Sequence, residues 1–198
     1  MLAIRIKYYY ALLALYVMSA QNLLAQVDEL PFSKIKLSLN LCLPTGYNNL
    51  QEYWEPGKGF GGAIQIPIYF GDIDIGLQYL PLKGNRNKYP DTKTFFLSVG
   101  WLGKINLPLN FSVSAGIKAG SVVMTFKDDT ISTFQRNESE LGLAGSAKAN
   151  WEIFYGFGIE AGIDFITIYT HRKIKYYVIS GGLSYSFDSP KWLKEFFE

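Results

Sequence analysis

Seven charged residues stand at positions where the surrounding pattern places small or polar side chains. They are Lys34, Lys36, Asp74, Lys118, Lys148, Glu160 and Asp164. An isolated charge is costly to bury, so lysines and carboxylates that are shielded from water pair with one another. We expect these residues to form a network of ion pairs that fills the interior of a closed sheet. The alternative is that they line a narrow polar path through that interior.

A second group of residues could bind a partner at the surface. Tyr47, Tyr53, Trp54 and Tyr89, together with Arg86, fall in segments rich in Gly, Asn and Pro that interrupt the strand pattern. Aromatic and arginine side chains are enriched in recognition surfaces. We expect these residues either to form a binding surface in loops or to lie at a membrane interface.

The residue inventory restricts other chemistry. Cys42 is the only cysteine, so the chain forms no internal disulfide. His171 is the only histidine, which makes a zinc site of the Cys/His type unavailable. The sequence therefore predicts neither a metal nor a cofactor.

The elements that position these residues are β-strands, because apolar residues alternate with small or polar ones along most of the chain. In 177–187, Tyr, Ile, Gly, Leu, Tyr and Phe fall on one face and Val, Ser, Gly, Ser and Ser on the other. The same period of two predicts eight strands in all. They lie near 34–43, 60–70, 73–80, 94–101, 110–119, 141–151, 156–165 and 177–187.

The connections between these strands alternate in length. Those near Gly71, Lys104 and Ile153 are short, and the others, after Leu43, Leu80, Gly120 and Tyr169, are mostly long. Strands of about 10 residues suit a tilted crossing of a bilayer. We therefore expect an all-β, eight-stranded antiparallel up-and-down transmembrane β-barrel over 27–187.

A soluble barrel and a membrane barrel share this alternation and differ in which face is inside. A soluble barrel would place the seven charges on its surface. The polar face is rich in Gly and Ser, and an eight-stranded barrel is just wide enough to be filled by side chains. Small residues and paired charges inside, with apolar residues facing lipid, are therefore the favoured arrangement.

The first 26 residues have the composition of a secretory signal peptide. Arg5 and Lys7 precede an apolar run over 8–18, and Ala25 offers a small residue at the cleavage point. The alternative, a membrane anchor, would require about 20 apolar residues. Cleavage would remove two of 19 basic residues and no acidic one, which leaves 17 of each. A neutral chain has no basic field with which to attract nucleic acid.

Several segments resemble small outer-membrane β-barrel proteins of the OmpA, OmpX and OmpW type, and above all the "outer membrane protein beta-barrel domain" proteins of Bacteroidetes-like bacteria. They are Gly59-Phe60-Gly61-Gly62-Ala63-Ile64, Leu107-Pro108-Leu109, Gly158-Ile159-Glu160-Ala161-Gly162 and Gly182-Leu183-Ser184-Tyr185-Ser186-Phe187. The resemblance covers nearly all of the mature chain. It implies a monomer in the outer membrane of a Gram-negative cell envelope, with both termini periplasmic.

The resemblance also implies partners and a range of functions. The expected partners are outer-membrane lipid, lipopolysaccharide and the barrel assembly machinery. The expected function is structural or surface-binding, with a lumen filled by polar and charged side chains. A porin-like transport conduit is one alternative. A lipid A-modifying enzyme is the other, but Lys173 stands where a deacylase-like pattern would place a serine two residues after His171.

The chain continues past the last strand, whereas similar barrels usually end there. Asp188 or Ser189 can cap a helix that starts at Pro190. Trp192 and Phe196 would then lie on one apolar stripe. We expect 188–198 to form a short amphipathic helix at the periplasmic membrane interface, where Trp is favoured.

Overall fold

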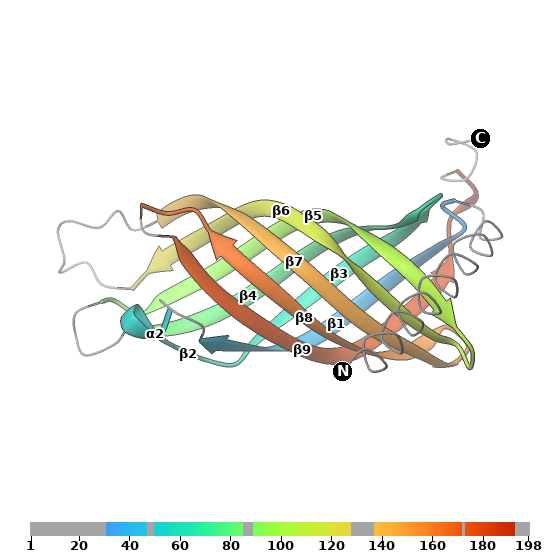
Figure 1. Ribbon diagram of the computed structural model, residues 1–198, viewed down its shortest axis with the longest axis horizontal. Coiled ribbons are helices and arrows are strands. Elements are labelled where there is room, and N and C mark those ends of the chain that lie inside the picture. Colours follow the sequence, from blue (N-terminus) through green and yellow to red (C-terminus); the bar gives the residue numbers. More distant parts are fainter. Residues whose placement is uncertain (1–30, 47–49, 85–88, 128–136, 172, 193–198) are drawn as a thin grey trace, which may run out of the picture.

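Eight long antiparallel strands form most of the protein (Figure 1). The computed structural model describes residues 31–46, 50–84, 89–127, 137–171 and 173–192. The strands are β1 (Lys34–Gly46), β3 (Gly59–Ile68), β4 (Gly71–Gly84), β5 (Thr92–Leu107), β6 (Phe111–Phe126), β7 (Asn137–Phe154), β8 (Phe157–Ile168) and β9 (Ile174–Asp188). The leader over 1–26 and the tail over 193–198 lie outside the described residues, so the signal peptide and the terminal helix stay predictions.

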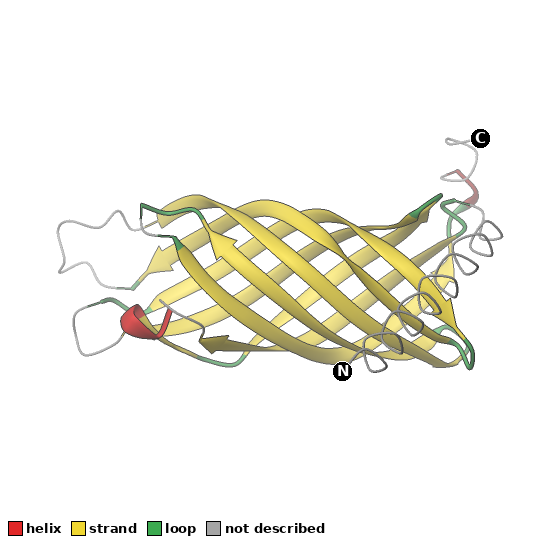
Figure 2. Cartoon of the chain, in the orientation of Figure 1, coloured by secondary structure: helices red, strands yellow, loops and turns green. Residues whose placement is uncertain are grey.

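The strands follow one another around a closed barrel in chain order. Each pairs antiparallel with its neighbours, and the first and last strands close the circle from Lys34↔Asp188 to Gly46↔Tyr176. Figure 2 shows that nearly all of the described chain is strand. The prediction of an eight-stranded up-and-down barrel is therefore confirmed.

The two ends of the barrel differ in the length of their connections. At the turn end, β3–β4, β5–β6 and β7–β8 are joined by connections of two or three residues. Gly71 and Gly156 adopt positive φ there, of 131° and 82°, which glycine tolerates best. The short connection predicted near Gly71 consists of Tyr69 and Phe70, because Gly71 already pairs with Ile68 and Asp72 with Pro67. The longer connections lie at the opposite, loop end.

The strands extend further toward the loop end than the alternation predicts. Half of the segment 121–140, which the predicted strands leave as a connection after Gly120, is strand, since β6 continues to Phe126 and β7 begins at Asn137. The connection from β1 to β3 also contains structure, namely α2 (Leu50–Tyr53) and β2 (Trp54–Pro56). Because β2 pairs with the end of β4, it continues the sheet beyond β3.

The outer surface of the barrel is apolar. Leu39, Ile117 and Leu183 expose 76%, 73% and 69% of their surface, and similar side chains follow every barrel strand. Their neighbours in sequence point inward and are buried, as the alternating burial along β7 illustrates. No helix in the described ranges is long and apolar enough to cross a membrane.

Candidate functional site

The interior of the barrel has three layers between its ends. An open polar cavity of about 310 Å³ lies at the turn end. A network of charged side chains crosses the middle. An apolar core fills the loop end, contributed by strands around the barrel and by the segment 50–54. Each layer follows from residues at inward positions of the strands.

The middle layer brings together six of the seven predicted charges. The carboxylate oxygens of Asp74 lie 2.6 Å from Lys148 Nζ and 3.3 Å from Lys118 Nζ. Lys118 also reaches Asp164 at 3.3 Å. Glu160 pairs with Lys36 at 3.2 Å and with Lys148 at 3.8 Å. Three lysines therefore balance three carboxylates, and the network links β1, β4, β6, β7 and β8.

Uncharged amides complete the network. Gln65 Nε2 donates to Asp74 at 2.9 Å, and Asn40 Nδ2 donates to Glu160 at 3.1 Å. Gln78 Nε2 donates to Asp164 at 2.5 Å. Gln78 thus reaches the Asp164 oxygen that Lys118 leaves available, whereas Gln65 donates to Asp74 Oδ2, which Lys148 also binds. The amides stand on the same inward face as the charges, but the sequence interpretation did not single them out.

Gly100 makes room for the stem of Lys118, because a Cβ there would lie 2.6 Å from Cγ of that lysine. A Cβ at Gly162 would lie 3.4 Å from Cγ of Lys148, which is ordinary van der Waals contact. The small residues on the polar face thus leave space that long side chains from other strands occupy. The cavity beside the network measures about 20 Å³, which holds about one water molecule.

Lys34, the seventh predicted charge, does not join the network. It is exposed and lines the turn-end cavity together with Lys36, Gln65 and Lys104. Within the described residues, Lys34 has no ion-pair partner. Lys34 lies two residues nearer than Lys36 to the turn end of β1, and this position places it outside the network.

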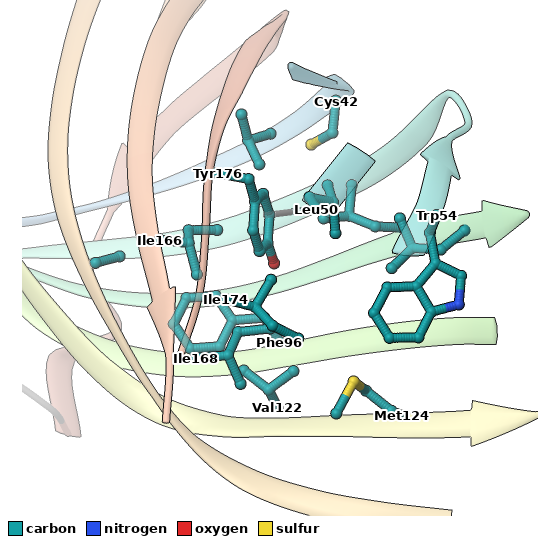
Figure 3. Close-up of a cluster of buried hydrophobic side chains, with 14 of the residues drawn as sticks. Cys42, Leu50, Trp54, Phe96, Val122, Met124, Ile166, Ile168, Ile174 and Tyr176 are labelled. Atoms are coloured by element: carbon teal, nitrogen blue, oxygen red, sulfur yellow. The ribbon is translucent and has the colours of Figure 1, made fainter. Parts of the chain in front are cut away.

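The apolar layer at the loop end is the main departure from the sequence interpretation. Side chains from β4 to β9, including Phe96, Val122, Ile166 and Tyr176, converge on the barrel axis and are buried (Figure 3). Leu50, from α2, enters the same core. The prediction of a lumen filled by polar and charged side chains therefore fails for this half. The physical reason is that the strands extend beyond the charge network toward the loop end and enclose an apolar core there.

Three of the predicted surface aromatics form a cluster at the rim of this core. Ring centroids of Tyr53 and Tyr89 lie 5.0 Å apart, and those of Trp54 and Tyr89 lie 5.9 Å apart. Trp54 is only 8% exposed, and its indole N–H donates to the carbonyl of Pro90 at 3.0 Å. Trp54 therefore anchors one connection to another. Tyr47 and Arg86 lie outside the described residues.

In the described part of the chain, the candidate catalytic residue has no nucleophile or acid hydrogen-bonded to it. His171 is exposed in the connection between β8 and β9, and no described residue is hydrogen-bonded to it. Nor do His, Cys, Asp and Glu side chains form a group suited to a metal ion anywhere in the described ranges. Cys42 is a buried free thiol in the apolar core.

The sequence matches no protein-family model and no curated protein. Solved structures are nevertheless similar in fold. Neisserial surface protein A (NspA) superposes with a TM-score of 0.53 at 12% identity, over 78% of this chain and 96% of NspA. The N-terminal β-barrel domain of Pseudomonas aeruginosa OprF gives 0.50 at 12% identity, over 80% of this chain and all of that domain. The fold is that of the small outer-membrane β-barrels.

At this level of identity the likeness concerns the fold alone. It agrees with the resemblance that the hairpins suggested from the sequence, including the number of strands and their antiparallel order. It assigns no ligand to the loop end and no role to the charges.

Proposed function

We propose that this protein is a monomeric β-barrel of the bacterial outer membrane with a closed lumen and a structural or surface-binding role. The observation that carries the proposal is the sorting of side chains between the two faces of the barrel. Large apolar side chains point outward along every barrel strand, while balanced charges are buried inside.

Lipid is the surrounding that suits the outer face. Soluble monomers rarely expose a continuous apolar patch larger than a few hundred Å². Here the apolar surface encircles the molecule, and aromatic residues such as Phe60, Trp101 and Trp151 stand exposed on it. Aromatic residues near strand ends are typical of the two interfaces of a membrane barrel.

The two interior layers argue against transport. An ion that moves along the axis would have to separate the buried pairs around Asp74 and then pass the apolar core. The charge network and most of the apolar core are made from the barrel strands themselves, so no loop movement alone removes them. The closed lumen thus favours a structural or binding role over a conduit.

The surroundings of His171 argue against lipid A hydrolysis. A histidine base acts on a nucleophile within hydrogen-bond reach. The histidine here is exposed and has no such neighbour among the described residues. We therefore assign the protein no enzymatic activity.

The remaining parts of the proposal concern the route to the membrane. The leader over 1–26 would direct export, and the barrel assembly machinery would insert the chain into a bilayer that contains lipopolysaccharide. β1 begins and β9 ends at the turn end, where Lys34 pairs with Asp188. With periplasmic turns, both termini would lie in the periplasm and the loop end would face outside.

Envelope fractionation and bilayer recording test the proposal. We expect the protein in the outer-membrane fraction, with a folded form that migrates differently on gels before and after heating. Planar bilayers containing it should show no conductance above the lipid background. A folded protein that stays soluble without detergent would contradict membrane insertion, and discrete channel openings would contradict the closed lumen.

A further inference from the structure

A small cavity at the loop end is built differently from the rest of the interior. It measures about 140 Å³ and lies between the aromatic cluster of Tyr53, Trp54 and Tyr89 and the ends of β6, β7 and β9. Phe126 and Ile174 contribute apolar walls. Cavities for drug-sized ligands measure roughly 300 Å³ or more, so this one suits a smaller group.

The aromatic wall of this cavity is held in place by contacts within the protein. Tyr53 packs edge-on against Tyr89, with an angle of 85° between the rings. Pro90 also lines the cavity, and its carbonyl already accepts hydrogen bonds from the Trp54 indole and from Thr92 Oγ1. The indole therefore presents ring surface, not a hydrogen-bond donor, to a ligand.

Among the described residues, the only charged side chain in the wall of this cavity is a carboxylate. Glu138 stands at an inward position of β7, opposite Met124 of β6, and Glu140 stands at the next inward position. Neither glutamate has an ion-pair partner within the described residues. Deeper in the barrel, by contrast, every carboxylate of the network has a lysine.

No lysine or arginine compensates for these glutamates from the strands around them. In the described residues, the inward positions toward the loop end carry apolar residues, glycine, threonine and the two glutamates on β4 to β9. The described walls of the cavity therefore combine apolar ring faces with a negative charge that no described lysine or arginine pairs with. Aromatic faces attract cations, most strongly in the case of Trp, and quaternary ammonium groups are bound in this way.

We propose that the loop-end cavity binds a small organic cation of the alkylated ammonium class. The alkyl groups pack against Tyr53, Trp54 and Tyr89, and the positive charge faces Glu138. The inference rests on the proposed function in one respect, since it is the outward orientation of the loop end that would expose the cavity to external ligands. It names the class of ligand that the surface-binding role would involve.

Calorimetric titration of the folded full chain tests this assignment. The protein is held in a maltoside detergent, because phosphocholine detergents carry the same chemical group as the probe. Choline is compared with 3,3-dimethylbutanol, which has the same shape without the charge. We expect choline to bind at least about tenfold more tightly, as cation–π and carboxylate attraction of about 1.4 kcal/mol would give.

Variants of two glutamates on the same strand separate the cavity from general charge effects. Glu138→Gln should weaken choline binding about three- to tenfold and leave dimethylbutanol unchanged. Glu152→Gln, near the turn end of β7, should change neither. Equal binding of the two probes, no binding of choline, or an unaltered choline affinity in Glu138→Gln would overturn the proposal.

The outcome is distinguishable from failure of the proposed function. Choline binding that depends on Glu138, in a protein that does not insert into membranes, would overturn the outer-membrane role and support the cavity assignment. An inserted, non-conducting barrel that does not distinguish choline from its neutral isostere would overturn only the cavity assignment.

Discussion

Replacing Asp74 with Asn should destabilise the barrel more than any change to a surface ion pair. Asp74 is fully buried and contacts two lysines, at 2.6 and 3.3 Å. Removing one partner of a buried pair costs about 3–5 kcal/mol. Lys118 keeps Asp164 at 3.3 Å and Lys148 keeps Glu160 at 3.8 Å, so we expect the lower end, about 3 kcal/mol.

The free energy of unfolding, from urea titration of the barrel in detergent micelles, measures this cost. Lys127→Gln is the matched control, because the Lys127–Asp91 pair spans 3.8 Å with both side chains largely exposed and should matter by less than about 1 kcal/mol. The double variant Asp74→Asn with Lys148→Met restores a balance of charges and should recover about half of the loss. Two results would contradict a stabilising role of the network. One is that Asp74→Asn lowers the free energy of unfolding no more than the control does, and the other is that the double variant is no more stable than Asp74→Asn alone.

The other predictions concern the outer face, the loop-end core and the hydrogen bond between Trp54 and Pro90. In each case the measurement is the free energy of unfolding in urea. Leu39→Arg on the outer face should cost about 2–4 kcal/mol in lipid, whereas Leu109→Arg at a turn should change stability by less than about 0.5 kcal/mol; equal losses would refute the topology. Phe96→Ala should cost about 3–5 kcal/mol, since the ring is buried in the loop-end core, and a loss under about 1 kcal/mol would place that ring outside it. Trp54→Phe should cost about 1 kcal/mol by removing the bond to Pro90, and unchanged stability would deny the anchor.

The charge network was predictable because it depends on a local pattern. Strand alternation fixes which face each residue occupies, and lone charges such as Asp74 and Lys118 on a face of Gly and Ser require partners on that face. Which lysine meets which carboxylate was not predictable. That depends on the pairing register across five strands, and a single-sequence pattern contains no such information.

The loop-end core was missed although a signal was present. Segments 122–126 and 165–168 are largely apolar at successive positions, which indicates strands buried on one face and in contact with an apolar medium on the other. The elements α2 and β2 gave no comparable signal, since four and three residues are too short for a period to be recognised. Their position depends on the distant bond between Trp54 and Pro90.

Spin labels on the outer face test the central claim most directly. Single cysteines at Leu39 and Ile117, in a Cys42→Ser background, would carry nitroxides, with Leu109 at a turn as the water-exposed reference. In lipid bilayers, we predict that relaxation by oxygen is strong at the first two sites and that relaxation by a water-soluble nickel chelate is weak, with the opposite order at the reference. Strong relaxation by the nickel chelate at Leu39 and Ile117 would contradict an outer face in contact with lipid.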